Sequence, residues 1–359
     1  MRRRLEETVF SVAGRRYDWL DVVLWATAFG DWTEFVANVR LGLACVHEAE
    51  DGGDEAEADE DAVEAAANEF RYTAGLLSAE EMDEWLAASG LTADEWMASI
   101  ERMVSRQGRS EEAEDILARF PVDDDEVESV LWCDGVCSGE LGRFARALAG
   151  RASIYERLRR EGQATDAVPD TGESPLPAME ELVAAIPGAP VDAIEERMAH
   201  LSRLESALRR FTAGVLTPRA IRDQISARYL DWIRFDSHVL SVADEQVARE
   251  AALSVRADGL DLGAVAPLAG TVVREERLYL DEAPPTVRDA LVSAGRGDLV
   301  GPLLVGDEFQ LVLVRDKVMP TEADPEVRRR AEGDLLARLL DREIAARVEW
   351  HHPIAESEG

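Results

Sequence analysis

The sequence predicts an α+β protein in which a large helical part precedes a small part that contains strands. Through residues 1–230, apolar side chains recur mainly at steps of three and four, the period of a helix packed on one face. Residues 232–240 and 309–315 instead alternate apolar and polar side chains, which is typical of half-buried strands. A helix-period segment that closes at Gly259 lies between them. We therefore expect one domain over residues 1–230 and another over 231–320.

Local signals organise the helical part. Residues 17–47 have a helical period rich in tryptophan, which predicts a buried helix. Residues 78–81 (Ser-Ala-Glu-Glu) and 92–95 (Thr-Ala-Asp-Glu) are capping boxes, in which a hydroxyl and a carboxylate satisfy free backbone donors, so each predicts a helix start. Residues 48–62 are acidic and offer little apolar surface to bury, so we expect a disordered loop. Residues 162–190 contain five prolines and are the predicted linker.

The formal net charge of −34 restricts the partners of the chain. Such a field repels nucleic-acid phosphates and anionic membranes, so we expect neither as a partner, and it favours basic peptides. Solubility alone explains the same charge equally well. Lys317 is the only lysine, so the chain has no Gly-x-x-x-x-Gly-Lys phosphate loop. No dinucleotide fingerprint is found either, and we expect no cofactor.

The cysteines and the N-terminal residues indicate in which cellular compartment we expect the protein. Cys45, Cys133 and Cys137 are too few for a disulfide framework, and nothing completes a four-ligand site around the last two. We therefore expect buried free thiols and no metal. Charged residues stand where the apolar core of a signal peptide would lie, and no stretch approaches the roughly 20 apolar residues of a membrane span. These patterns predict a cytoplasmic protein.

Three short motifs in the second part carry a resemblance to a known family. They are Ser-His-Val-Leu at 237–240, Val-Ala-Arg-Glu-Ala at 247–251 and Gly-Asp-Leu-Val-Gly-Pro at 297–302. In this order they resemble a parvulin domain, the rotamase module of periplasmic and membrane-anchored peptidyl-prolyl isomerase chaperones. The likeness covers about a quarter of the chain. It implies an antiparallel sheet flanked by helices over residues 231–320.

The helical part is similar to the same chaperones in places. Residues 68–72, 85–86 and 90–92 resemble the helical N-domain of parvulin-type, SurA-like chaperones, which cradles unfolded peptide. The whole layout resembles the parvulin-like proteins of bacterial peptide maturation systems. This resemblance implies a chaperone-like domain over 1–230 and a C-terminal helix over 321–350 that returns to pack on it. A plain helical bundle with ordinary capping explains the same residues without any family.

The resemblance also selects candidate site residues. His238 stands at the first histidine position of the family, but Gln310 occupies the second, and Val287 replaces an aromatic residue that grips proline. These losses, with an altered loop after Gly270, predict weak or absent catalysis. A simple strand histidine paired near Asp236 is the alternative for His238. Candidate peptide-binding residues are Asp236, Val287, Phe309 and Tyr279.

Three functions remain open from the sequence. The first is a chaperone or adaptor that binds an unfolded or precursor peptide of basic character, together with modifying enzymes of the same pathway. The second is an active peptidyl-prolyl isomerase that uses His238. The third is an acidic helical scaffold without a peptide groove.

Overall fold

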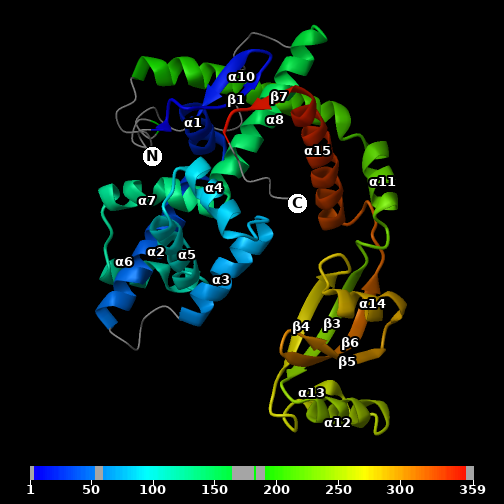
Figure 1. Ribbon diagram of the computed structural model, residues 1–359. Helices are drawn as coiled ribbons and strands as arrows, with labels where there is room; N and C mark the ends of the chain where they lie inside the picture. The colour runs from blue at the N-terminus through cyan, green and yellow to red at the C-terminus, as the bar shows by residue number, and fades with distance from the viewer. Residues whose placement is uncertain (1–3, 53–59, 164–181, 183–190, 353–359) are drawn as a thin grey trace. The chain divides into compact units, whose positions relative to one another are not determined.

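The computed structural model describes residues 4–52, 60–163, 182 and 191–352 of the chain (Figure 1). It is a mixed α+β protein, as the sequence predicts, and it contains two small antiparallel sheets. The chain divides into two compact units. The large unit comprises Met1–Phe211 and Leu339–Gly359, and the small unit comprises Thr212–Arg338. Among the described helices, none is long and apolar enough to cross a membrane.

Helices make up most of the large unit. They are α1 (Trp19–Phe29), α2 (Trp32–Gly52), α3 (Glu60–Thr73), α4 (Ala79–Ser89), α5 (Ala93–Ser105), a 3-10 turn (Ser110–Glu112), α6 (Ala113–Arg119), α7 (Asp124–Cys137), α8 (Glu140–Arg160) and α10 (Val191–Val215), whose last four residues fall in the small unit. Both predicted capping boxes are present. Ser78 and Thr92 each accept a hydrogen bond from the backbone N–H three residues later, at 3.2 Å, and so begin α4 and α5.

A small sheet was missed by the sequence analysis. Its strands, in the order β2-β1-β7, are β2 (Arg15–Asp18), β1 (Thr8–Val12) and β7 (Val348–Trp350). The predicted helix over 17–47 is therefore wrong at its start, because residues 17 and 18 complete a hairpin. Ala13 and Gly14 both have positive φ, which suits a tight two-residue hairpin turn. The helical segment is also interrupted between Phe29 and Trp32.

The expected acidic loop over 48–62 is also wrong in part. α2 continues to Gly52 and α3 begins at Glu60, while residues 53–59 lie outside the described residues. Glu48 is not a solvated charge, because it pairs with Arg109 at 2.7 Å and with Arg119 at 2.5 Å. These ion pairs hold the last turns of α2 against the turn before α6 and against α6 itself. Most of the predicted linker over 162–190 lies outside the described residues.

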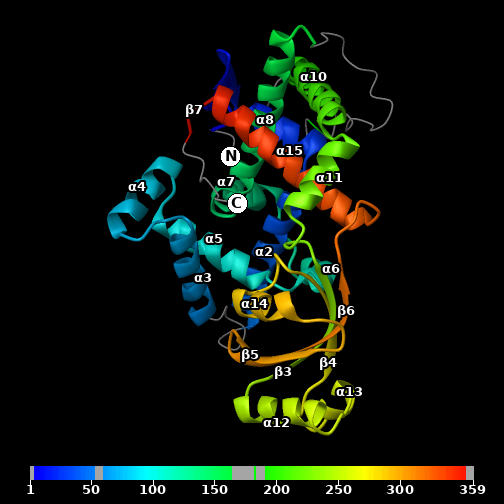
Figure 2. The same ribbon diagram turned by 90° about the vertical axis from the view of Figure 1, so that its right-hand side faces the viewer.

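The small unit is built on an antiparallel sheet in the order β4-β3-β6-β5. Its elements are α11 (Pro218–Ala227), β3 (Arg234–Val242), α12 (Glu245–Arg256), α13 (Leu262–Val265), β4 (Val273–Tyr279), α14 (Pro285–Ser293), β5 (Leu299–Val305), β6 (Glu308–Val318) and the first half of α15 (Pro325–Arg347). α14 covers one face of the sheet, and α12 and α13 cover the other (Figures 1 and 2).

Helix α15 contributes to both units. Its first half packs Val327 and Ala331 with Ile221 and Trp232 in a separate cluster of the small unit. Its second half, from Leu339, belongs to the large unit. There it lies along α8, where Arg157 pairs with Glu343 at 2.9 Å and a Cβ on Gly150 would lie 3.2 Å from Leu340. The predicted C-terminal helix over 321–350 is thus one helix and a short strand.

Candidate functional site

His238 lies on β3 in the small unit, where its strand neighbours are Glu275 on β4 and Leu313 on β6. Its Nε2 atom is 3.6 Å from the Glu275 carboxylate, and its side chain is 26% exposed. Asp236 is not its partner, because that carboxylate pairs with Arg234 at 3.1 Å and Arg277 at 3.3 Å. His238 is thus a half-buried strand histidine beside an exposed glutamate.

Gln310 does not lie with His238. In the register of β3 and β6, Gln310 stands opposite Ser241, three residues along β3 from His238. Side chains alternate between the faces of a sheet, and directly paired residues share a face. Gln310 is therefore on the α14 side, with Val312, while His238 shares the other side with Leu240. The two residues cannot form one catalytic pair.

The remaining candidates in the small unit are mainly packing residues. Val287 is 3% exposed, in the core between α14 and the sheet. Tyr279 is 5% exposed and lies under the guanidinium of Arg330, with 3.7 Å from Cζ to the ring centroid. Phe309 packs on the α12 side. The structure does not gather the six predicted site residues around one cavity.

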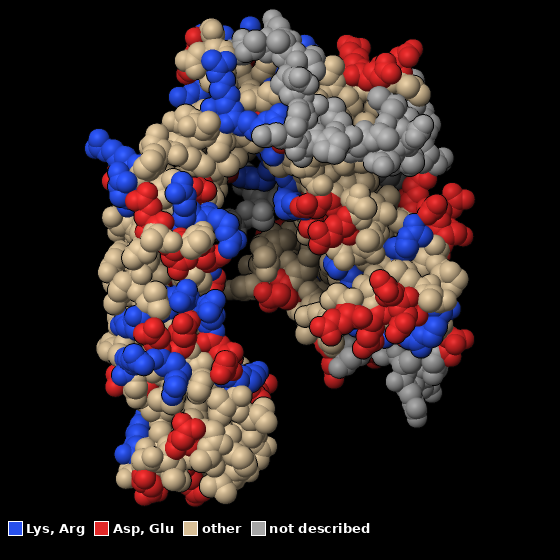
Figure 3. Space-filling view, turned by 180° about the vertical axis from the view of Figure 1, so that it is seen from behind, with Lys and Arg blue, Asp and Glu red and all other residues tan. Residues whose placement is uncertain are grey.

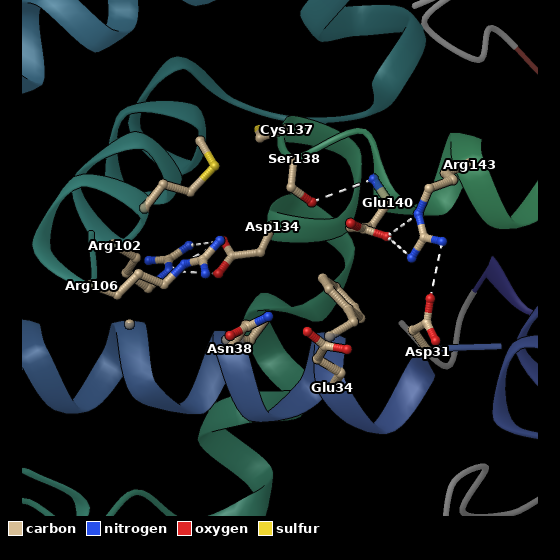
Figure 4. A pocket seen from close by; sticks show the side chains of 14 residues that line it. Asp31, Glu34, Asn38, Arg102, Arg106, Asp134, Cys137, Ser138, Glu140 and Arg143 are labelled. Atoms are coloured by element: carbon tan, nitrogen blue, oxygen red, sulfur yellow. Dashed lines mark hydrogen bonds and ion pairs between the residues drawn. The ribbon is translucent and has the colours of Figure 1, made fainter. Parts of the chain in front are cut away.

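Two cavities of the large unit lie on opposite sides of α5. The first, the α2–α5 pocket, has a volume of about 430 Å³ and is lined by residues of α2, α5, α7 and the start of α8 (Figure 4). Gly42 lets α2 and α5 approach closely, because a Cβ there would lie 3.1 Å from the Arg102 carbonyl oxygen. Phe35, Val39 and Met103 supply its apolar surface.

A buried ion pair forms part of the wall of this pocket. Arg102 donates from Nε to Asp134 Oδ2 at 3.0 Å and from Nη2 to Oδ1 at 2.5 Å. Both residues are buried. Burial opposes the charge of Arg102, but the hydrogen bonds and the negative charge of Asp134 outweigh it and raise the pKa of the guanidinium. These hydrogen bonds hold the guanidinium against the carboxylate.

Cys133 and Cys137 lie one turn apart on α7, and Cys137 also lines the α2–α5 pocket. Their sulfur atoms are 3.9 Å apart. Both are buried free thiols, as predicted. The hydrogen bond that Cys137 shares with Cys133, and then burial, raise the pKa of Cys137, so this thiol stays protonated. No cluster of three or more metal-binding side chains occurs among the residues that the structure places.

The second cavity, the α3–α5 groove, is an open depression of about 380 Å³ between those two helices. Its lining combines apolar and acidic side chains. We call its apolar residues, Val63, Ala67, Trp96 and Met97, the floor, and its carboxylates, Glu60, Glu64 and Glu101, the rim. Arg71 is at the edge and donates to the carbonyl oxygen of Leu76 at 3.2 Å.

The sequence analysis missed both cavities. The helical period identified Trp96 as a buried side chain of α5, but it could not show that Met97 remains 38% exposed beside it. The usable signal was the spacing of Glu60 and Glu64, which places two carboxylates on one face of α3 next to an apolar stripe. The signal for the pocket was the same spacing of Arg102 and Arg106 at the C-terminal end of α5.

Comparison with known proteins adds little. No family model and no curated protein sequence matches this chain. One solved structure that matches comes from work describing PEB4 and the periplasmic protein Cj1289 as SurA-like chaperones of Campylobacter jejuni. The match has 8% identity and a TM-score of 0.18 and covers 67% of this chain and 93% of the other. At this TM-score the backbones do not superpose as one fold, and the likeness carries no weight for function.

Proposed function

We propose that this protein is a peptide-binding chaperone or adaptor that takes basic, amphipathic segments into the α3–α5 groove. The observation that carries the proposal is the combination of the apolar floor, which includes Trp96 and Met97, with the rim of three carboxylates. An amphipathic helix binds such a groove by its apolar face, and an exposed methionine adapts to different side chains.

Charge selects the peptide. Within the described part of the chain, Glu60, Glu64 and Glu101 form no ion pair, so their charges are available to a ligand. A peptide arginine about 4 Å from one of them gains about 1 kcal/mol in water-like surroundings and more where water is excluded. The net charge of −34, part of which is seen as red Asp and Glu side chains in Figure 3, adds long-range attraction, which salt screens over about 8 to 10 Å.

In this proposal the small unit is a parvulin-like module without catalysis. Its sheet covered by helices on both faces agrees with what the sequence resemblance implies. Separation of His238 and Gln310 on opposite faces argues against an active isomerase pocket. The ligand would then be a precursor peptide, handed to modifying enzymes of a maturation pathway, as the layout of the sequence suggests.

Exposed apolar side chains at the α12–α13 end of the small unit agree with a chaperone. Leu253, Leu268 and Val272 are 62%, 80% and 72% exposed. Exposed apolar side chains can contact the apolar side chains of an unfolded peptide.

Fluorescence polarisation tests the groove. The probe is a labelled 18-residue amphipathic helix of leucine and arginine, and its matched control carries glutamate for arginine. We expect the basic peptide to bind in 50 mM salt, at least tenfold more tightly than at 300 mM. Glu64→Gln should weaken binding a fewfold, and Met97→Asp should abolish it because it places a charge on the apolar floor.

Glu84→Gln on α4 is the control, since Glu84 is exposed and outside the groove. Equal binding of the basic and acidic peptides, or full binding by the Met97→Asp protein, would reject the groove as the site. The acidic scaffold without peptide binding would then be favoured.

A further inference from the structure

The α2–α5 pocket holds two charges that the protein itself does not neutralise. Of the three arginines in its lining, Arg102 pairs with Asp134, and Arg143 pairs with Glu140 at 2.5 Å and Asp31 at 3.2 Å. This leaves Arg106 and Glu34. Neither forms an ion pair or a side-chain hydrogen bond within the described residues.

The two charges lie toward different ends of the pocket (Figure 4). Glu34, Asn38 and Gly42 occupy successive turns of α2, and α5 crosses α2 at Gly42. Glu34 and Gly42 are eight residues apart, which is about 12 Å along the helix axis. Arg106 directly follows the last residue of α5, one turn beyond Arg102, at the Gly42 end. From Arg106 to Glu34 the pocket thus passes from a basic group, past an amide, to a carboxylate, and the ion pairs of Arg143 with Asp31 and Glu140 lie beyond Glu34.

The basic end has hydrogen-bond donors that are available to a ligand. Arg102 uses Nε and Nη2 on Asp134, so its Nη1 group is not engaged in that pair. Arg106 is half-buried and presents a full guanidinium. Two guanidinium groups at successive turns, one held rigidly by a buried carboxylate, are well suited to bind a carboxylate.

We propose that the α2–α5 pocket binds a short zwitterionic peptide of two or three residues. Its carboxylate would lie against Arg106 and Nη1 of Arg102, its ammonium group against Glu34, and its backbone against Asn38. An extended chain spans about 3.3 to 3.6 Å per residue, so three residues reach about 10 Å, and the side chains of Glu34 and Arg106 cover the remaining distance. Apolar side chains of the ligand would pack on Phe35, Val39 and Met103.

The volume agrees with this class of ligand. About 430 Å³ lies in the ordinary range for small-molecule sites. A long peptide cannot place both of its termini in one such pocket. This site is therefore distinct from the α3–α5 groove, which lies on the other side of α5 and would take the middle of a chain. Failure of either proposal leaves the other standing.

Isothermal titration calorimetry on the full chain tests the pocket with three probes: Ala-Leu-Ala, its N-acetylated form and its C-terminal amide. We expect the free tripeptide to bind at least tenfold more tightly than either blocked form, since each block removes one charge-assisted contact. Free leucine, which is too short to reach both charges, should bind at least tenfold more weakly than the tripeptide.

Two variants assign the charges. Arg106→Gln should lower affinity for Ala-Leu-Ala at least tenfold and leave affinity for the amide unchanged. Glu34→Gln should lower affinity for Ala-Leu-Ala at least tenfold and leave affinity for the N-acetylated peptide unchanged. Arg16→Gln, at an exposed position of strand β2, is the matched control and should change nothing. No detectable binding of the tripeptide at millimolar concentration would overturn the proposal, as would equal losses for free and amidated probes in Arg106→Gln. Circular dichroism confirms that each variant is folded.

Discussion

Removal of Asp134 is the most informative perturbation of the large unit. In the folded protein Asp134 and Arg102 are 5% and 8% exposed, and the carboxylate receives hydrogen bonds from both Nε and Nη2 of the arginine. Asp134→Ala leaves the guanidinium buried without a counter-charge. Breaking a buried pair in this way costs about 3 to 5 kcal/mol. For a unit of this size, each kcal/mol moves the melting temperature by about 2 to 4 °C, so we expect a decrease of about 6 to 20 °C.

Differential scanning calorimetry measures the change, and Asp341→Ala provides the reference. Asp341 pairs with Arg146 at 3.1 Å in the same unit, but the two side chains are 61% and 34% exposed. Its loss should cost no more than about 1 kcal/mol. If Asp134→Ala is no worse than Asp341→Ala, the buried pair is not important for stability.

The double variant Arg102→Met, Asp134→Leu separates charge from shape. Apolar side chains of similar size remove the unpaired charge and keep the space filled, so most of the lost stability should return. A double variant as unstable as Asp134→Ala would show that the loss comes from packing, which refutes the electrostatic explanation.

Two further predictions concern histidines. His200 is buried against the Tyr17 hydroxyl at 3.0 Å, and burial, aided by Arg15 and Arg203, lowers its pKa to about 3. Below about pH 6.5 the unfolded chain therefore binds a proton that the folded chain does not bind, so the free energy of unfolding should fall from about pH 6.5 to 3. In urea titrations, His200→Gln should reduce this dependence on pH. An unchanged dependence would contradict His200 as its origin. In a coupled proline-isomerisation assay, we expect both the parent protein and His238→Ala to leave the reaction at its uncatalysed rate. Robust turnover by the parent protein that is lost in His238→Ala would instead establish an isomerase.

The parts of the fold with local signals were predictable. α4 and α5 begin where their capping boxes place them, because a cap depends on residues only three positions apart. β3 and β6 were found from alternation, since one side of each strand is clearly apolar. β4 was not, because its middle is a run of charged residues, Arg274 to Arg277, on a sheet edge. Charges there protect an edge strand and conceal it from pattern analysis.

The site was less predictable, because it depends on which helices meet. Arg102 and Asp134 are 32 residues apart and carry no common motif. The unpaired state of Glu34 and Arg106 appears only when every other charge in the pocket has been assigned a partner. Sequence resemblance directed attention to His238, and the register of β3 with β6 then separated it from Gln310. Pairing register across the sheet is not encoded in short motifs.

The position of β1 has a consequence for how the chain is made. β1 is the middle strand of its sheet and joins β7 through partners such as Ser11 and Glu349, which are 338 residues apart. During synthesis the β1 edge stays without its partner until α15 and β7 have left the ribosome, after the whole small unit. The unit that is translated first is therefore the one that is completed last, and its open strand edge must be protected from other chains throughout that interval.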